Sequence, residues 1–73
     1  YEAYSLRGET HKLQENWDLA IADFEKARRF DEVVAETYAK RAEAHKAAGR
    51  TSEAASDRKR AAELDPNQFG TSP

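Results

Sequence analysis

The sequence predicts an all-α protein: two tandem helix–turn–helix repeats, with four antiparallel helices in a short right-handed α-solenoid. The main observation is a 34-residue spacing between similar residues, a period typical of stacked helix–turn–helix arrays. The equivalent pairs are Ala3/Thr37, Tyr4/Tyr38, Gly8/Ala42, His11/His45, Ala20/Ala54 and Ala27/Ala61. Alanine and long charged side chains, which favour helices, are frequent, and Val33-Val34 is the only adjacent β-branched pair.

The first two helices are predicted at about residues 2–14 and 18–30. In the first, Tyr4, Gly8 and His11 recur at steps of three and four residues and therefore share one side. Asn16 is expected to cap the second helix. The apolar stripe of that helix consists of Trp17, Ala20, Ile21, Phe24, Ala27 and Phe30.

The third and fourth helices are predicted at about residues 35–48 and 52–64. Gly49 is a good left-handed stop for the third helix, and Thr51 or Ser52 is expected to cap the fourth. Pro66 cannot continue a helix interior, because it lacks the N–H and its ring meets the preceding turn. The segment from Asn67 onward is therefore expected to be frayed.

The chain resembles a tandem of two tetratricopeptide repeats, residues 1–34 and 35–68, followed by a tail at residues 69–73. The matches are Tyr4, Gly8, Ala20, Phe24 and Ala27 in the first copy, and Tyr38, Ala42, Gly49, Ala54, Ala61 and Leu64-Asp65-Pro66-Asn67 in the second. The resemblance implies packing roles for Tyr4, Gly8, His11, Trp17, Ala20, Phe24, Ala27, Tyr38, Ala42, His45, Ala54, Ala61 and Pro66. Small residues are expected where antiparallel helices approach each other most closely.

Three positions depart from the family pattern. Glu32 stands where the family usually has proline, and Glu15 where it often has glycine, so Asn16 is expected to manage that turn. Arg58 stands where the first copy has Phe24. Most large apolar residues lie before residue 35, so the fourth helix is expected to be the solvent-facing end of the array.

The resemblance also implies a concave face lined by the first helix of each repeat. Its candidate binding residues are Glu2, Ser5, Glu9, Lys12, Glu36, Lys40, Glu43 and Lys46. This lining is charged and mixed in sign, which suits a groove for a peptide or a partner helix. The alternative is a solvated helix face held by pairs such as Glu36–Lys40.

Other kinds of site find less support. His11 and His45 could form a metal pair, but only these two candidate ligands recur, so packing is favoured and no metal is expected. The basic runs around Arg28-Arg29 and Arg58-Lys59-Arg60 alternate with acids in a chain of net charge −2, so nucleic-acid binding is not expected. No arrangement of residues indicates a nucleophile or a phosphate-binding loop, so neither an enzyme nor a cofactor is expected.

The size and composition predict one small domain of 73 residues. No stretch is long and apolar enough to suggest a membrane span. The absence of cysteine weakly favours a cytoplasmic location. The chain starts without methionine, so it is expected to be part of a longer scaffold or adaptor, acting as a protein–protein interaction module. The alternatives are an engineered minimal repeat fragment or a self-associating unit that uses Tyr1, Leu6 and Leu13 on its outer side.

Overall fold

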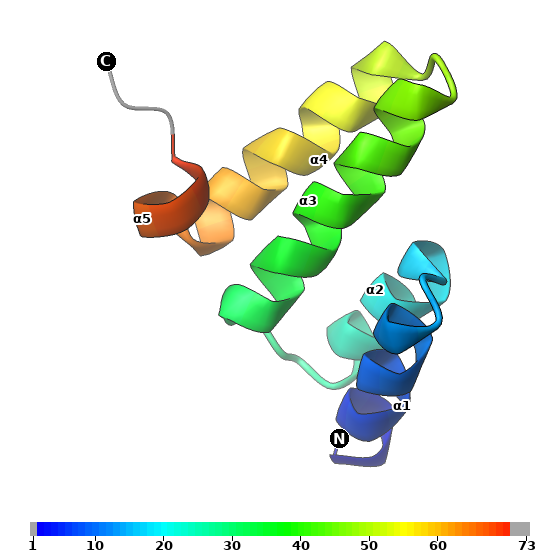
Figure 1. Ribbon diagram of the computed structural model, residues 1–73. Helices are drawn as coiled ribbons and strands as arrows, with labels where there is room; N and C mark the ends of the chain where they lie inside the picture. The colour runs from blue at the N-terminus through cyan, green and yellow to red at the C-terminus, as the bar shows by residue number, and fades with distance from the viewer. Residues whose placement is uncertain (1, 71–73) are drawn as a thin grey trace.

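The computed structural model describes residues 2–70, and Tyr1 lies outside this range together with residues 71–73. The described residues form five helices and no strand (Figure 1). The helices are α1 (Glu2–Leu13), α2 (Trp17–Lys26), α3 (Glu32–Ala47), α4 (Thr51–Leu64) and α5 (Pro66–Phe69). The all-α prediction is therefore confirmed.

Each helix packs against the next one along the chain. The most extensive contacts join α3 to α4 and α1 to α2, while α2 meets α3 and the short α5 lies against α4 (Figure 1). The radius of gyration is 11.8 Å, close to the ~11 Å expected of a compact domain of this length. The molecule is thus two helix pairs joined through α2 and α3.

The turns within the two pairs have the same backbone conformation. Glu15 and Gly49 both adopt the left-handed region, with φ of 63° and 83°. Asn16 and Arg50, which follow them, share φ of −89° and have ψ of 75° and 73°. The expected caps are wrong: neither Asn16 nor Arg50 makes a side-chain cap, and Thr51 already lies inside α4. Asn16 was expected to manage the first of these turns, but Glu15 itself adopts the left-handed conformation.

The corner between α2 and α3 differs from the prediction on both sides. Helix α2 ends at Lys26 rather than near residue 30, because Arg28 adopts a left-handed φ of 55° and breaks the helix. Helix α3 begins at Glu32, three residues early, because the Asp31 carboxylate accepts hydrogen bonds from the amides of Val33 and Val34. Proline is therefore not needed at this corner, since the Asp31 cap starts the helix.

Residues 66–70 are also more ordered than predicted, and the rest of the segment expected to be frayed, residues 71–73, lies outside the described residues. Pro66 stops α4, as expected, but it occupies the first turn of α5, where its missing N–H is not needed. Asp65 accepts a hydrogen bond from the amide of Gln68. The Asn67–Phe69 segment is therefore helical rather than frayed, and Gly70 is extended, so the chain leaves the helical path there.

The core lies where the helices meet. Its most buried residues are Ala20, Ile21, Phe24, Val34, Ala35, Thr37, Tyr38, Ala42, Ala54 and Ala61. Gly8 shows why a small residue is needed: a Cβ there would lie 2.7 Å from the ring of the fully buried Phe24. Ala27 is half-buried at the end of α2, and Pro66 is exposed.

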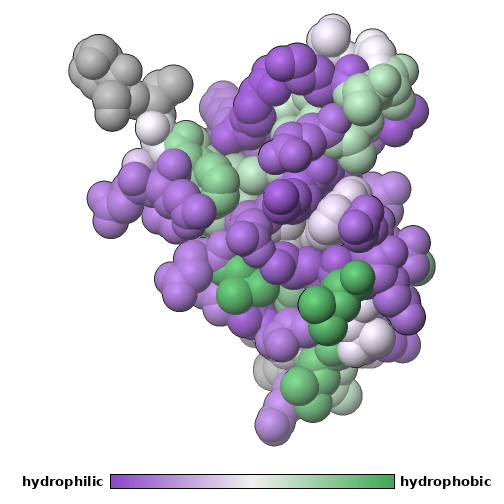
Figure 2. Space-filling view, in the orientation of Figure 1, coloured by the Kyte–Doolittle hydropathy of each residue, from purple (hydrophilic) through white to green (hydrophobic). Residues whose placement is uncertain are grey.

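Not every predicted packing residue is buried. Tyr4 is 40% exposed, although its equivalent Tyr38 is only 8% exposed. Phe30, expected in the stripe of α2, is exposed because that helix ends before it. Leu6 and Leu13 are exposed, as expected of the outer side of α1. Figure 2 shows a largely hydrophilic surface whose strongest apolar patches lie over the half of the molecule that contains α1 and α2.

Candidate interaction surface

An ion cluster around a buried carboxylate joins α1 to α2. Asp23 lies in the interior with its side chain only 5% exposed. Arg7 donates to it twice, from Nε at 2.7 Å and from Nη2 at 2.9 Å. The Nε2 atom of His11 lies 3.6 Å from the same carboxylate. This paired arrangement compensates the carboxylate for the water that burial removes.

The same cluster recurs between α3 and α4. Arg41 donates to the buried Asp57 from Nε at 2.7 Å and from Nη2 at 2.8 Å, and His45 Nε2 lies 3.5 Å from that carboxylate. The remaining nitrogen of Arg41 reaches Asp18 on α2 at 3.0 Å. Arg41 therefore links the two helix pairs as well as the two helices of its own pair.

The clusters shift the pKa values of Asp23 and Arg41. The two hydrogen bonds from Arg7 hold the pKa of Asp23 below its ordinary value and outweigh the opposing effect of burial. The hydrogen bonds from Arg41 to Asp57 raise the pKa of that guanidinium in the same way. Both groups therefore stay charged in the folded protein.

Sequence reasoning missed these clusters, although a signal was present. Asp23 and Asp57 belong to the acids that alternate with the basic runs, and no buried role was predicted for them, but both are buried. Arg7 precedes Asp23 by the same sequence separation as Arg41 precedes Asp57, and the two pairs are related by the repeat period. A search for oppositely charged residues at this repeated spacing would have found them.

The face formed by the first helix of each pair, here called the first-helix face, consists of Glu2, Ser5, Glu9, Lys12, Glu36, Lys40, Glu43 and Lys46. Its α1 half is occupied by internal contacts. Arg29 donates to Ser5 at 2.9 Å and to Glu9 at 2.5 Å. Lys12 pairs with Glu36 across α1 and α3, and that contact lowers the pKa of the Glu36 carboxyl. These side chains stabilise the fold.

The α3 half of the first-helix face is more open. Within residues 2–70, the side chains of Glu43 and Lys46 make no hydrogen bond or ion pair, and the same holds for the side chain of Glu2 at the start of α1. Lys40 influences Glu36 electrostatically but forms no ion pair with it. The exposed charges of α3 are therefore the part of this face that remains available to a partner.

Trp17 lies at the edge of that open half. It is half-buried at the first position of α2, beside the surface of α3. An open hollow of about 370 Å³ is lined by Glu15, Trp17, Lys40, Glu43 and Ala44. Core packing was favoured for Trp17 over a ligand-facing role, and in the structure it lines a hollow together with two residues of the predicted binding face.

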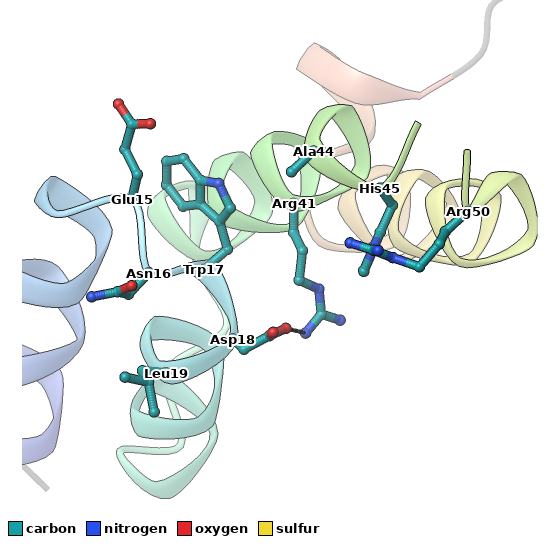
Figure 3. Close-up of a pocket in the computed structure, with 9 residues that line it drawn as sticks. All are labelled: Glu15, Asn16, Trp17, Asp18, Leu19, Arg41, Ala44, His45 and Arg50. Carbon is teal, nitrogen blue, oxygen red and sulfur yellow. Dashed lines mark hydrogen bonds and ion pairs between the residues drawn. The ribbon is translucent and has the colours of Figure 1, made fainter. Parts of the chain in front are cut away.

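A second hollow, of about 340 Å³, shares Glu15, Trp17 and Ala44 with the first (Figure 3). Its labelled residues come from the start of α2, from the end of α3 and from the two turns. Asp18 and Arg41 meet across it, and Arg50 Nε donates to His45 Nδ1 at 2.9 Å. An aromatic ring that lines two open hollows beside charged side chains suits a peptide with an apolar anchor and charged neighbours.

The structure offers little for other kinds of site. His11 and His45 each lie beside the aspartate of their own helix pair, and no group of three metal-ligating side chains occurs within residues 2–70. None of the described helices has the length and apolar character needed to cross a bilayer. Comparison with protein-family models, with curated proteins and with solved structures gives no match.

Proposed function

We propose that the chain is a protein–protein interaction module made of two tandem tetratricopeptide-type hairpins. The observation that carries the proposal is that one set of contacts occurs twice, at equivalent positions of the two hairpins. The Arg7–Asp23 and Arg41–Asp57 pairs have the same donor atoms and similar distances. The two hairpin turns share their backbone angles. Such recurrence is what a repeat array requires and what an unrelated helical bundle has no reason to show.

The binding role rests on the open half of the first-helix face. Lys40, Glu43 and Lys46 are charges on one rigid helix, and Trp17 supplies an aromatic contact beside them. Charges of both signs next to a ring favour an extended or helical peptide with an apolar side chain flanked by charged residues. The α1 half contributes less, because Ser5, Glu9 and Lys12 are already paired.

A screen with a displayed random-peptide library tests this proposal, followed by NMR titration of the labelled chain with a selected peptide. We expect shifts concentrated at the Trp17 indole, Lys40 and Glu43. The Lys40→Glu variant should weaken binding about threefold or more, since it reverses a charge beside the ring. Lys59→Glu, on the exposed side of α4, is the matched control. Peptides that bind with shifts confined to α4, or equal effects of the two variants, would contradict the proposal.

A further inference from the structure

The two helix pairs present unequal ends. On α3, Tyr38 is 8% exposed and the Arg41 side chain 24% exposed. Their equivalents on α1, Tyr4 and Arg7, are 40% and 57% exposed. The difference arises because α2 lies against α3, whereas no helix of residues 2–70 precedes α1. The face of α1 that carries Tyr4 and Arg7 is therefore exposed, whereas the equivalent face of α3 is covered by α2.

At the other end of the molecule, the α3–α4 surface that would pack against such a face is also open. An open hollow of about 290 Å³ is lined by Ala39, Ala42, Glu43, Lys46, Arg58, Ala61 and Phe69. At the position of Arg58, the first pair has Phe24, which is fully buried. Arg58 is exposed and leaves this space unfilled. The surface on which α3 packs in the first helix pair is therefore open in the second helix pair.

Charged side chains at the two ends also lack the partners that their equivalents have inside the molecule. Lys12 of the first pair binds Glu36 of α3, and the equivalents of these two residues are Lys46 and Glu2. Neither has a partner within residues 2–70. The third nitrogen of Arg41 binds Asp18, whereas that of Arg7 makes no hydrogen bond to any described residue, and Ser52 stands at the position equivalent to Asp18.

Helix α5 leaves room for an incoming helix. Its residues 66–69 are equivalent to residues 32–35, the first turn of α3, and both turns are capped by aspartate. Glu2, where α1 begins, is equivalent to Glu36 and thus to position 70 of this chain. The backbone becomes extended at Gly70 and leaves the helical path. A second α1 would continue the array at the point where α5 stops.

We propose that the chain associates head-to-tail with a second copy of itself, α1 of one copy lying on the α3–α4 face of the other as α3 lies on α1 and α2. Glu2 then meets Lys46 of the other copy, and Arg7 meets Ser52. This contact joins two different surfaces, so it does not close at two copies. The inference goes beyond the proposed function and does not require that the chain bind a peptide.

Sedimentation equilibrium of the whole chain, from about 10 μM to about 1 mM, tests the proposal. The average mass should rise with concentration and pass beyond that of a dimer. Arg58→Phe, which restores the side chain of the first pair, should tighten association about tenfold or more. A mass that stops at two copies would overturn the head-to-tail geometry, and an Arg58→Phe variant that stays monomeric at every concentration would overturn the interface.

Charge reversal identifies the surfaces. Glu2→Lys and Lys46→Glu should each weaken association about three- to tenfold, because each sets like charges opposite each other. A mixture of the two variants should associate as tightly as the original chain, since each supplies the partner that the other needs. Lys59→Glu is the control and should change nothing. If the mixture associates no better than either variant alone, Glu2 and Lys46 do not meet and the proposal fails.

Discussion

Arg41 donates two hydrogen bonds, of 2.7 and 2.8 Å, to the buried carboxylate of Asp57. Arg7 and Asp23 form the same contact at the equivalent positions of the first helix pair. Each contact fixes two helices of one pair in register, because a planar guanidinium binds a carboxylate in few orientations. The hydrophobic core alone, rich in alanine, would constrain the helices less.

Asp57→Asn should destabilise the protein by about 1–3 kcal/mol, since it weakens hydrogen bonds to a charged group in a buried site. Chemical denaturation of the variant and of the original chain measures the difference. Glu53→Gln, on the exposed side of the same helix, is the control and should change stability by no more than about 0.5 kcal/mol. Equal effects of the two variants would show that the buried pair does not hold the helices together.

Stability should fall on acidification. Asp23 and Glu36 have lower pKa values in the folded protein than in the unfolded chain, so the unfolded chain binds more protons. Their contribution to stability is complete above the unfolded values of about 4 and is lost as the pH falls through the lower folded values. Denaturation curves from pH 6 to about pH 2 measure this dependence.

The matched variants for the acid dependence are Asp23→Asn and Glu25→Gln, which lie on the same helix. Asp23→Asn should flatten the loss of stability below about pH 4, because the group with the lowered pKa is gone. Glu25 is exposed, and its replacement should leave the pH dependence unchanged. A dependence that is the same in both variants would assign the acid sensitivity to other groups.

Gly8→Ala should destabilise the protein even though alanine favours helices. The added Cβ would lie 2.7 Å from the fully buried Phe24 ring and 3.2 Å from the carbonyl oxygen of Ala20, so the ring or the helices must shift. We expect a net loss of roughly 1 kcal/mol or more, after a helix-propensity gain of about 1 kcal/mol. Thermal and chemical unfolding test it, and an increase in stability would show that α1 and α2 do not approach this closely.

Glu15→Gly should stabilise the protein. Glu15 holds a φ of 63°, which glycine adopts without strain, and Gly49 occupies the equivalent position in the second turn. We expect a gain in stability of about 0.5–1 kcal/mol. This is the free energy of the left-handed strain that is relieved, minus the cost of the greater conformational freedom of glycine in the unfolded chain. Asn16→Gly, one residue later, has no such strain to relieve and should not stabilise. A loss of stability in Glu15→Gly would place the turn elsewhere.

The predictable part of the structure is the part with strong periodicity. The existence of four main helices follows from the 34-residue pattern, and Gly49 and Pro66 act as stops where expected. The end of α2 was not predictable, because Arg28 carries no sequence signal for a left-handed conformation. Tyr4 looks like a core residue from its equivalence with Tyr38, but burial depends on which helix covers it.

The candidate site was predicted in part. The eight charged or polar positions of the first-helix face could be identified from the register of the resemblance, but their pairing could not. Whether Lys12 meets Glu36 or Glu9 meets Arg29 depends on how α3 and the corner after α2 lie against α1. Trp17 joins the open half of the face because α2 begins at its position, a boundary that periodicity places only within a few residues.

The central claim is that the chain is a stack of 34-residue hairpin units, and insertion of one more unit tests it most directly. A copy of residues 1–34 placed after Val34 should fold and unfold at higher denaturant concentration than the original chain, because each added unit contributes another interface. A copy of residues 1–30 at the same place is out of phase and should lower stability. An in-phase insertion that fails to fold, or is no more stable than the out-of-phase one, would contradict the account.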